Sequence, residues 1–267
     1  MDRVSRVHTA RSIHFYFHYL QHYSRLYLRA ATLSIGLAPG LTNLLAAHAK
    51  HLMDRTDAID ISIMLGLGDQ HGKAAIEWTV DNLGTDFTVM RAGSRVVVSS
   101  FTDGKITDFG LSLGHRKSYR FNFADQHALS RTLGVPLVST RLCFDSAAVT
   151  ILLAWLRAGG VFRLLKLQRI CHAAILLFSK LRFGKEMFAV KIDAWGKKGQ
   201  DDLLIECLVQ GIKEASITAK VAATVADKVY RSVLPHGVYH IDQLLEWESL
   251  FPELPPEIKV DIRINGK

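Results

Sequence analysis

The segment Leu33-Ser34-Ile35-Gly36-Leu37-Ala38-Pro39-Gly40-Leu41-Thr42-Asn43-Leu44-Leu45-Ala46 places a glycine- and proline-rich turn directly before a helical pattern. The helical pattern runs from Leu44 to Met53, and Thr42 or Asn43 can cap its start. Backbone N–H groups at the beginning of such a helix point toward the preceding turn. The sequence therefore predicts a site for an anion, or for the edge of a cofactor, at this turn.

Downstream of the turn, the apolar residues follow a strand period in some segments and a helix period in others. Strand patterns cover residues 58–67, 87–90, 96–98, 119–123, 137–144, 188–195, 203–209 and 258–264, and helical patterns cover 74–83, 126–133, 147–156, 170–178 and 217–233. Short turns between neighbouring strand patterns predict hairpins at 87–98 and 188–209. Strict alternation of strands and helices is not visible, so we expect an α+β fold with a mixed, largely antiparallel sheet and helices packed on it.

The charge of the chain is concentrated in two segments. The 267 residues include 33 Lys and Arg against 25 Asp and Glu, a formal net charge of +8. Residues 1–38 contain five Arg and one Asp, and residues 146–185 contain seven basic and no acidic residues. Neither segment has zinc-finger spacing, an aromatic RNA-binding signature or a long basic run, so we expect no nucleic-acid partner.

The basic segment 146–185 is also strongly apolar. Its two apolar runs, 147–156 and 170–178, are each shorter than a bilayer-spanning helix, which disfavours a transmembrane hairpin. Two interpretations remain open. The segment can form two core helices with a basic outer face, or an apolar, basic surface that docks on a partner or an anionic membrane.

Histidines and cysteines give weak signals in this sequence. His14, His18 and His22 would share one face of a helix, which permits metal binding, but a simple helical extension explains the spacing equally well, and we assign no metal site. Cys143, Cys171 and Cys207 are far apart in apolar surroundings, which indicates buried thiols in a reducing compartment and hence a cytoplasmic protein.

The common catalytic signatures are absent from the sequence, so the candidates are polar residues in loops. Asp69 and His71 lie in a glycine-flanked loop, where a carboxylate near an imidazole can form an acid/base pair. The alternative is that Asp69 caps a helix and His71 meets solvent. Polar clusters at 122–127 and 237–240 can bind a ligand or can serve as caps and turns.

Four of these segments, taken in order, resemble the saccharopine dehydrogenase-like (saccharopine reductase-like) oxidoreductase family. Residues 33–46 are similar to the GxxPGLxN segment of that family. The agreement continues through Gly66-Leu67-Gly68-Asp69-Gln70-His71-Gly72 with Trp78 and Thr79, through residues 122–126, and to residues 237–244. The resemblance covers roughly residues 33–245.

The resemblance implies a two-domain enzyme that transfers a hydride at a C–N bond. A Rossmann domain binds NAD or NADP, and a second α+β domain binds an amino acid or polyamine-type substrate and forms a homodimer. By resemblance, the residues beside the nicotinamide are Gly36, Pro39, Gly40 and Asn43. The catalytic pair is Asp69 and His71, and the substrate-binding residues are Trp78, Asn122, Asp125, Gln126, Tyr239 and His240.

The sequence departs from the family pattern before the turn at residues 36–40. The residues that precede Gly36 include no glycine, so they cannot supply the glycine-rich turn of a Rossmann domain. We therefore expect residues 1–32 to be an atypical extension or remnant, 33–250 the substrate-binding and dimerisation domain, and 251–267 a tail. We do not expect this chain alone to bind NAD or NADP. The alternative is a non-catalytic interaction or membrane-surface docking protein derived from the same fold.

Overall fold

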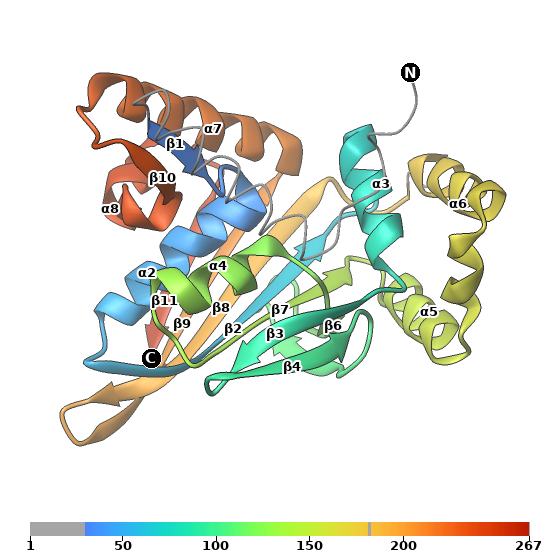
Figure 1. The fold of residues 1–267 in the computed structure, drawn as a ribbon, viewed down its shortest axis with the longest axis horizontal. Helices are drawn as coiled ribbons and strands as arrows, with labels where there is room; N and C mark the ends of the chain where they lie inside the picture. Colours follow the sequence, from blue (N-terminus) through green and yellow to red (C-terminus); the bar gives the residue numbers. More distant parts are fainter. Residues whose placement is uncertain (1–29, 181–182, 267) are drawn as a thin grey trace.

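The computed structural model describes residues 30–180 and 183–266, and a nine-stranded sheet dominates them (Figure 1). Its main path runs β11-β9-β8-β2-β7-β3-β4, with β6 paired to β7 and β5 paired to β6. The strands are β2 (Arg55–Leu65), β3 (Asp86–Arg91), β4 (Ser94–Ser99), β5 (Lys105–Asp108), β6 (His115–Arg120), β7 (Leu137–Phe144), β8 (Met187–Lys198), β9 (Asp201–Ile212) and β11 (Lys259–Ile264). Within this sheet β2 and β7 pair in parallel and the other pairs are antiparallel, which confirms the expected mixed, largely antiparallel sheet.

A second, two-stranded sheet joins two distant parts of the chain. Strand β1 (Ala30–Leu33) pairs in parallel with β10 (Gly237–His240), with Leu33 opposite His240. This pairing places the segment that opens the glycine-rich turn beside the segment near residue 240. Both segments carry the family-like motifs, and the sequence patterns did not predict either strand.

The helices lie in two groups around the main sheet. They are α2 (Thr42–His51), α3 (Lys73–Asn82), α4 (Ala124–Thr132), α5 (Ala147–Ala158), α6 (Gln168–Lys180), α7 (Glu214–Arg231) and α8 (Trp247–Leu250), with short turns η1 (Leu37–Leu41), η2 (Val161–Lys166), η3 (Ile241–Gln243) and η4 (Phe251–Glu253). Figure 1 shows α2 and α4 across one face of the sheet with α7 and α8 near them, and α3, α5 and α6 at the other end. The turn η1 is irregular, because Ala38 and Pro39 have extended backbones.

The core follows from the period-two pattern of the central strand β2. Ile59, Ile61 and Ile63 alternate along the strand and are fully buried in the same cluster as Leu44 and Leu45 of α2. The residues between them belong to the opposite face, where the Ser62 hydroxyl lies 2.9 Å from the Thr107 hydroxyl of β5. One face of the sheet is therefore apolar and covered by helices, and the other is partly polar.

The structure corrects the sequence-based strand at 119–123. Strand β6 ends at Arg120, and Phe121 and Phe123 are buried in the connection to α4. The Gln126 side-chain amide donates to the carbonyl oxygens of Phe121 and Phe123, at 2.8 and 3.1 Å. The N–H of Phe121 still donates to the Thr140 carbonyl of β7 at 3.0 Å, but Gln126 occupies the two carbonyl oxygens, and the regular ladder ends here. Phe121 and Phe123 keep the alternation that suggested a longer strand.

The basic, apolar segment forms two helices as expected, but they are not both core helices. Helix α5 buries Thr150, Leu153 and Ala154, whereas no residue of α6 is fully buried. The interpretation of the second helix as a core helix is therefore wrong. Of the helices in the described residues, none is long and apolar enough to cross a membrane.

The prediction of buried thiols is confirmed for two of the three cysteines, and the histidines at 14, 18 and 22 lie outside the described residues. Burial raises the pKa of Cys143 and of Cys207 to about 12, so both are buried, unreactive thiols. Cys171 is half-buried, so the expectation of three buried thiols is wrong at that residue. His14, His18 and His22 lie outside the described residues, and residues 30–180 and 183–266 contain no group of His, Cys, Asp and Glu arranged to hold a metal.

Candidate functional site

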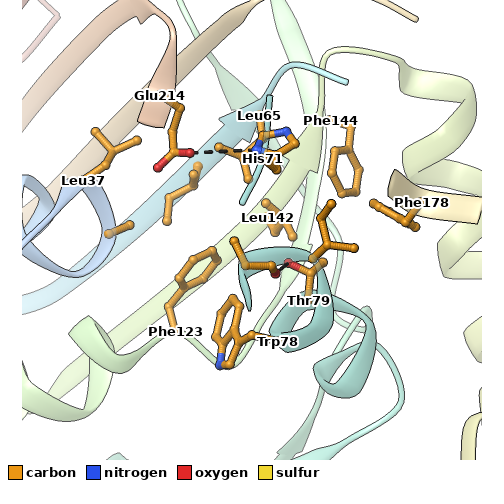
Figure 2. A pocket seen from close by; sticks show the side chains of 14 residues that line it. Leu37, Leu65, His71, Trp78, Thr79, Phe123, Leu142, Phe144, Phe178 and Glu214 are labelled. Atoms are coloured by element: carbon orange, nitrogen blue, oxygen red, sulfur yellow. Dashed lines mark hydrogen bonds and ion pairs between the residues drawn. The ribbon is translucent and has the colours of Figure 1, made fainter. Parts of the chain in front are cut away.

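An apolar cavity of about 130 Å³ lies between the glycine-rich turn, the end of β2, α3 and β7 (Figure 2). Among the described residues that line it, His71 and Glu214 are the ones that ionise. The lining residues are Leu37, Ala38, Ile63, Leu65, His71, Ala75, Ile76, Trp78, Thr79, Phe123, Leu142, Phe144, Phe178 and Glu214. The cavity therefore combines an apolar wall with one acid/base pair.

His71 is held in the loop after β2 by contacts at both ring nitrogens. Its Nε2 lies 3.0 Å from the carbonyl oxygen of Gly66, and its Nδ1 lies 3.8 Å from Oε2 of Glu214. A carbonyl oxygen can only accept, so Nε2 carries a proton and the neutral ring turns the lone pair of Nδ1 toward the carboxylate. The Glu214 carboxylate and the Gly66 carbonyl raise the pKa of His71, against the effect of burial.

Glu214 opens helix α7 and connects the His71 loop to the glycine-rich turn. Its Oε1 accepts a hydrogen bond from the Thr218 hydroxyl at 2.9 Å. The oxygen of that hydroxyl accepts from the backbone N–H of Leu37 at 3.2 Å. Sequence reasoning missed Glu214, because an acidic residue in the first turn of a helix is common and nothing linked it to His71.

Asp69 stands close to His71 in the sequence but has another role in the structure. Its Oδ2 accepts from the backbone N–H of Glu214 at 2.6 Å, and its Oδ1 accepts from the N–H of Gln70 at 2.7 Å. Asp69 thus caps the start of α7 and contributes to His71 only through its charge. The carboxylate that contacts the imidazole is that of Glu214, so the Asp69–His71 pair expected from the sequence is not formed.

A Cβ would strain the glycine-rich turn at Gly40, and the amide groups of the turn bond within the chain. Gly40 has φ +143°, and a Cβ atom there would lie 3.1 Å from the carbonyl oxygen of Ser34. The N–H of Gly40 donates to Oδ1 of Asn43, and that of Leu41 to the carbonyl of Gly36. Asn43 is buried, and its amide donates to Asp242 at 3.0 Å. Gly36, Pro39, Gly40 and Asn43 therefore shape the turn.

The described residues do not fit a nicotinamide dinucleotide. The N–H groups of Leu37, Gly40, Leu41 and Thr42 already have acceptors within the chain, so these amides are not free to hold a pyrophosphate. The main sheet contains a single parallel pair in its described strands, whereas a Rossmann domain requires several. The anion site expected at the turn is thus closed by the chain's own contacts.

Trp78 of α3 forms one wall of the cavity, as the substrate-site prediction requires. Its ring meets Phe121 edge-on with 5.4 Å between ring centroids, and Phe123 at 5.1 Å. Such aromatic pairs add to the free energy of burial and fix the ring position. Trp78 is therefore a rigid surface on which an apolar ligand can pack.

Asn122, Asp125 and Gln126 are buried and do not line the cavity. The Gln126 amide nitrogen donates to the backbone carbonyl oxygens of Phe121 and Phe123, and its amide oxygen accepts from the backbone N–H of Thr140. The Asn122 side chain forms hydrogen bonds with Asn82 and with Nε2 of His127. Oδ1 of Asp125 accepts from the Thr140 hydroxyl at 2.6 Å, and burial raises the pKa of Asp125. Asp125 and Gln126 hold α4 against β7, and Asn122 joins α3 to α4, so the three residues have structural contacts away from the cavity.

Tyr239 and His240 belong to the small sheet and also lie away from the cavity lining. The Tyr239 hydroxyl donates to the carbonyl of Pro235, and Nδ1 of His240 lies 2.8 Å from the Ser34 hydroxyl. Burial lowers the pKa of His240. The His240 contact attaches β10 to the segment that leads into the glycine-rich turn, whereas the Tyr239 contact stays within the segment around β10.

A scan against protein-family models finds no match to this chain, and a search of curated proteins finds no similar sequence. The resemblance therefore stands on the residues of the four motifs. Of the residues predicted from them, the cavity brings together His71 and Trp78, beside the glycine-rich turn. To these the structure adds Glu214.

Proposed function

We propose that residues 33–250, together with strand β11, which completes their main sheet, are the substrate-binding and dimerisation domain of a saccharopine dehydrogenase-like, NAD(P)-dependent oxidoreductase that acts on C–N bonds. The observation that carries the proposal is the His71–Glu214 pair in the wall of an apolar cavity beside the turn at residues 36–40. An apolar cavity with few convergent polar groups is the usual form of a small-molecule site. NAD or NADP would accept the hydride, and another domain or chain would hold it.

The cavity favours an amine over an amino acid as its ligand. The carboxylate of Glu214 can accept hydrogen bonds from an ammonium group, and the walls formed by Trp78 and Phe123 can pack against its carbon chain. The described lining contains no Lys or Arg that would pair with a substrate carboxylate. Of the two substrate classes that the resemblance implies, we therefore propose the polyamine-type.

The acid/base pair can also remove a proton from the bound amine. When His71 is protonated, its charge and that of Glu214 cancel. An ammonium group that donates to Glu214 competes with Nδ1 of His71 for the carboxylate, and this lowers the pKa of His71. A neutral His71 has its Nδ1 lone pair on the side of Glu214 and can act as the general base for the substrate nitrogen, which leaves the free amine that oxidation at the adjacent carbon requires.

Calorimetric titration with a simple amine tests this proposal. We expect butylamine to bind and butanol, its uncharged counterpart, to bind at least about tenfold more weakly, because butanol lacks the charge-assisted hydrogen bond to Glu214. Glu214→Gln should reduce the butylamine affinity by a similar factor. Glu186→Gln, at an exposed glutamate outside the cavity lining, is the matched control and should leave it unchanged. Equal affinity of the Glu214→Gln variant and the parent for butylamine would contradict the proposal.

Titration with NADPH and NADH tests whether the cofactor is held by another domain or chain. We expect no binding of either dinucleotide by this chain alone, because the amides of the turn at residues 36–40 bond within the chain. Tight binding of NADPH or NADH would show that the cofactor site lies on this chain, and would refute the assignment of the cofactor to another domain.

A further inference from the structure

Helices α5 and α6, with the turn η2 between them, present many large apolar side chains to solvent. The surface, called here the α5–α6 surface, stands at the end of the molecule away from α2, α7 and α8 (Figure 1). Trp155 is 75% exposed and Leu177 is 62% exposed. The exposed large apolar residues are Ile151, Leu152, Trp155, Val161, Leu164, Leu167, Ile170, Leu176 and Leu177. An apolar patch spread over three elements marks an interaction site.

Helix α6 has a second apolar stripe beside the one that packs on the protein. Its inner stripe is half-buried and consists of Cys171, Ala174, Ile175 and Phe178. Its outer stripe, Ile170, Ala173 and Leu177, repeats at helical spacing and is exposed. A surface helix packs on its own domain through one apolar stripe. The outer stripe of α6 is therefore available for contact with another apolar surface.

The charges on the α5–α6 surface are all positive and mostly unpaired. Arg163, Lys166, Arg169 and Lys180 are exposed, and no described acidic residue forms an ion pair with them. Residues 146–185 contain no Asp or Glu. Arg157 differs, since its guanidinium lies 2.7 Å from Asp86. The segment that carries the exposed apolar residues therefore also carries exposed cations.

We propose that the α5–α6 surface docks this protein on an anionic lipid membrane. A second copy of the chain fits poorly, because a two-fold contact would set cations against cations. An anionic bilayer offers both complements: headgroup charge for the arginines and lysines, and acyl chains for Leu177 and its neighbours. Trp155 has the amphipathic ring that favours the membrane interface. The helices are too short to span, so the surface lies in the plane of the membrane.

Co-sedimentation with lipid vesicles tests the proposal. We expect the full chain to bind vesicles of phosphatidylcholine and phosphatidylserine, and to bind vesicles of phosphatidylcholine alone much more weakly. Each cation near an anionic surface contributes about fivefold to the affinity, so high salt should release the protein. Absence of binding to the anionic vesicles, or binding independent of phosphatidylserine, would overturn the proposal.

Variants locate the binding surface. Trp155→Ser with Leu177→Ser should weaken vesicle binding by about tenfold or more, because both side chains lose their apolar contact with the acyl region. The matched control is Tyr230→Ser with Leu111→Ser, which changes an aromatic residue and a leucine that are even more exposed, outside α5 and α6. Arg163→Gln with Arg169→Gln should also weaken binding, against Arg91→Gln with Arg95→Gln on the β3–β4 hairpin as control.

The same variants separate a membrane from a protein partner. Vesicle binding that survives in the Trp155→Ser, Leu177→Ser variant would show that another surface binds lipid. A change of that variant from dimer to monomer, measured by light scattering, would show that the α5–α6 surface is a contact between copies of this chain. Either result would overturn the proposal.

Discussion

His71 is held between a carbonyl oxygen that keeps one ring nitrogen protonated and a carboxylate that favours a proton on the other. This arrangement raises the pKa of His71 above its ordinary value, chiefly through the Glu214 carboxylate, and so favours the protonated ring. Glu214 sets that property, and Asp69 fixes Glu214 by capping the helix on which it lies. The acid/base chemistry of the cavity is therefore divided between three residues of distinct roles.

Removal of the Glu214 charge should lower the pKa of His71. The folded protein raises this pKa above 6.5, chiefly through the Glu214 carboxylate, so Glu214→Gln should move it down toward or below that value. Heteronuclear NMR of the imidazole ring measures the shift directly. Glu186→Gln serves as the control, and an unchanged His71 pKa in the Glu214→Gln variant would contradict the assigned pairing.

The same pair makes stability depend on pH. Because the folded state raises the pKa of His71, its stabilising contribution is complete below pH 6.5 and is lost as the pH rises through the folded pKa. We expect urea unfolding to show this loss in the parent protein. In the Glu214→Gln variant the loss should be smaller, and an identical pH dependence in both proteins would argue against the pair.

Removal of the Asp125 charge should not destabilise the protein at neutral pH, because that charge is buried. Burial raises its pKa above 3.8, so the unfolded chain ionises first and stability falls as the pH rises from 3.8 to the folded pKa. Asp125→Asn keeps an acceptor for Thr140 and removes the buried charge. We expect equal or higher stability at neutral pH and loss of that pH dependence. Asp125→Ala, which leaves the Thr140 hydroxyl unpaired, should cost about 2 kcal/mol in urea unfolding.

The residues of the site were only partly predictable from sequence. His71 and Trp78 stood near glycine turns and an apolar helix, and both line the cavity. Asp125 and Gln126 were equally good candidates for substrate-binding residues. Whether such a polar side chain faces a ligand or is buried depends on the residue with which it forms hydrogen bonds. That partner is Thr140 on β7, and no local pattern indicates this contact.

At the scale of elements, the glycine-rich turn is the part whose shape matters most. It links β1, α2 and α7, and the cavity opens beside it. Elements of strong periodicity, such as β7 and the β8–β9 hairpin, were predictable because their contacts are local or their alternation is long. The short strands β1 and β10 were not, since each has four residues and its partner lies on a distant segment.

A side chain at residue 40 should damage the turn. Gly40→Ala combines a backbone with φ +143° and a Cβ atom 3.1 Å from the Ser34 carbonyl, so we expect a loss of about 1–3 kcal/mol in urea unfolding. Gly72→Ala is the matched control: its φ is −64° and its Cβ would meet open space. Equal stability of the two variants would show that the turn is not conformationally restricted.

At the scale of the whole molecule, the two ends of the sheet have different functions in this account. The cavity lies where the turn, β2, α3 and α7 meet, and the α5–α6 surface stands beyond α3. Phe178 belongs to both regions, because it lines the cavity from the inner side of α6. A protein docked through α5 and α6 would thus hold its cavity close to the membrane.

The pKa of His71 in the presence of an amine tests the central claim most directly, because it depends on both the acid/base pair and its ligand. We expect saturating butylamine to lower this pKa in ring-resolved NMR titrations, since the ammonium group competes with Nδ1 for the Glu214 carboxylate. Butanol should leave it unchanged. A His71 pKa that saturating butylamine leaves unchanged or raises would contradict the assignment of His71 and Glu214 as the amine site.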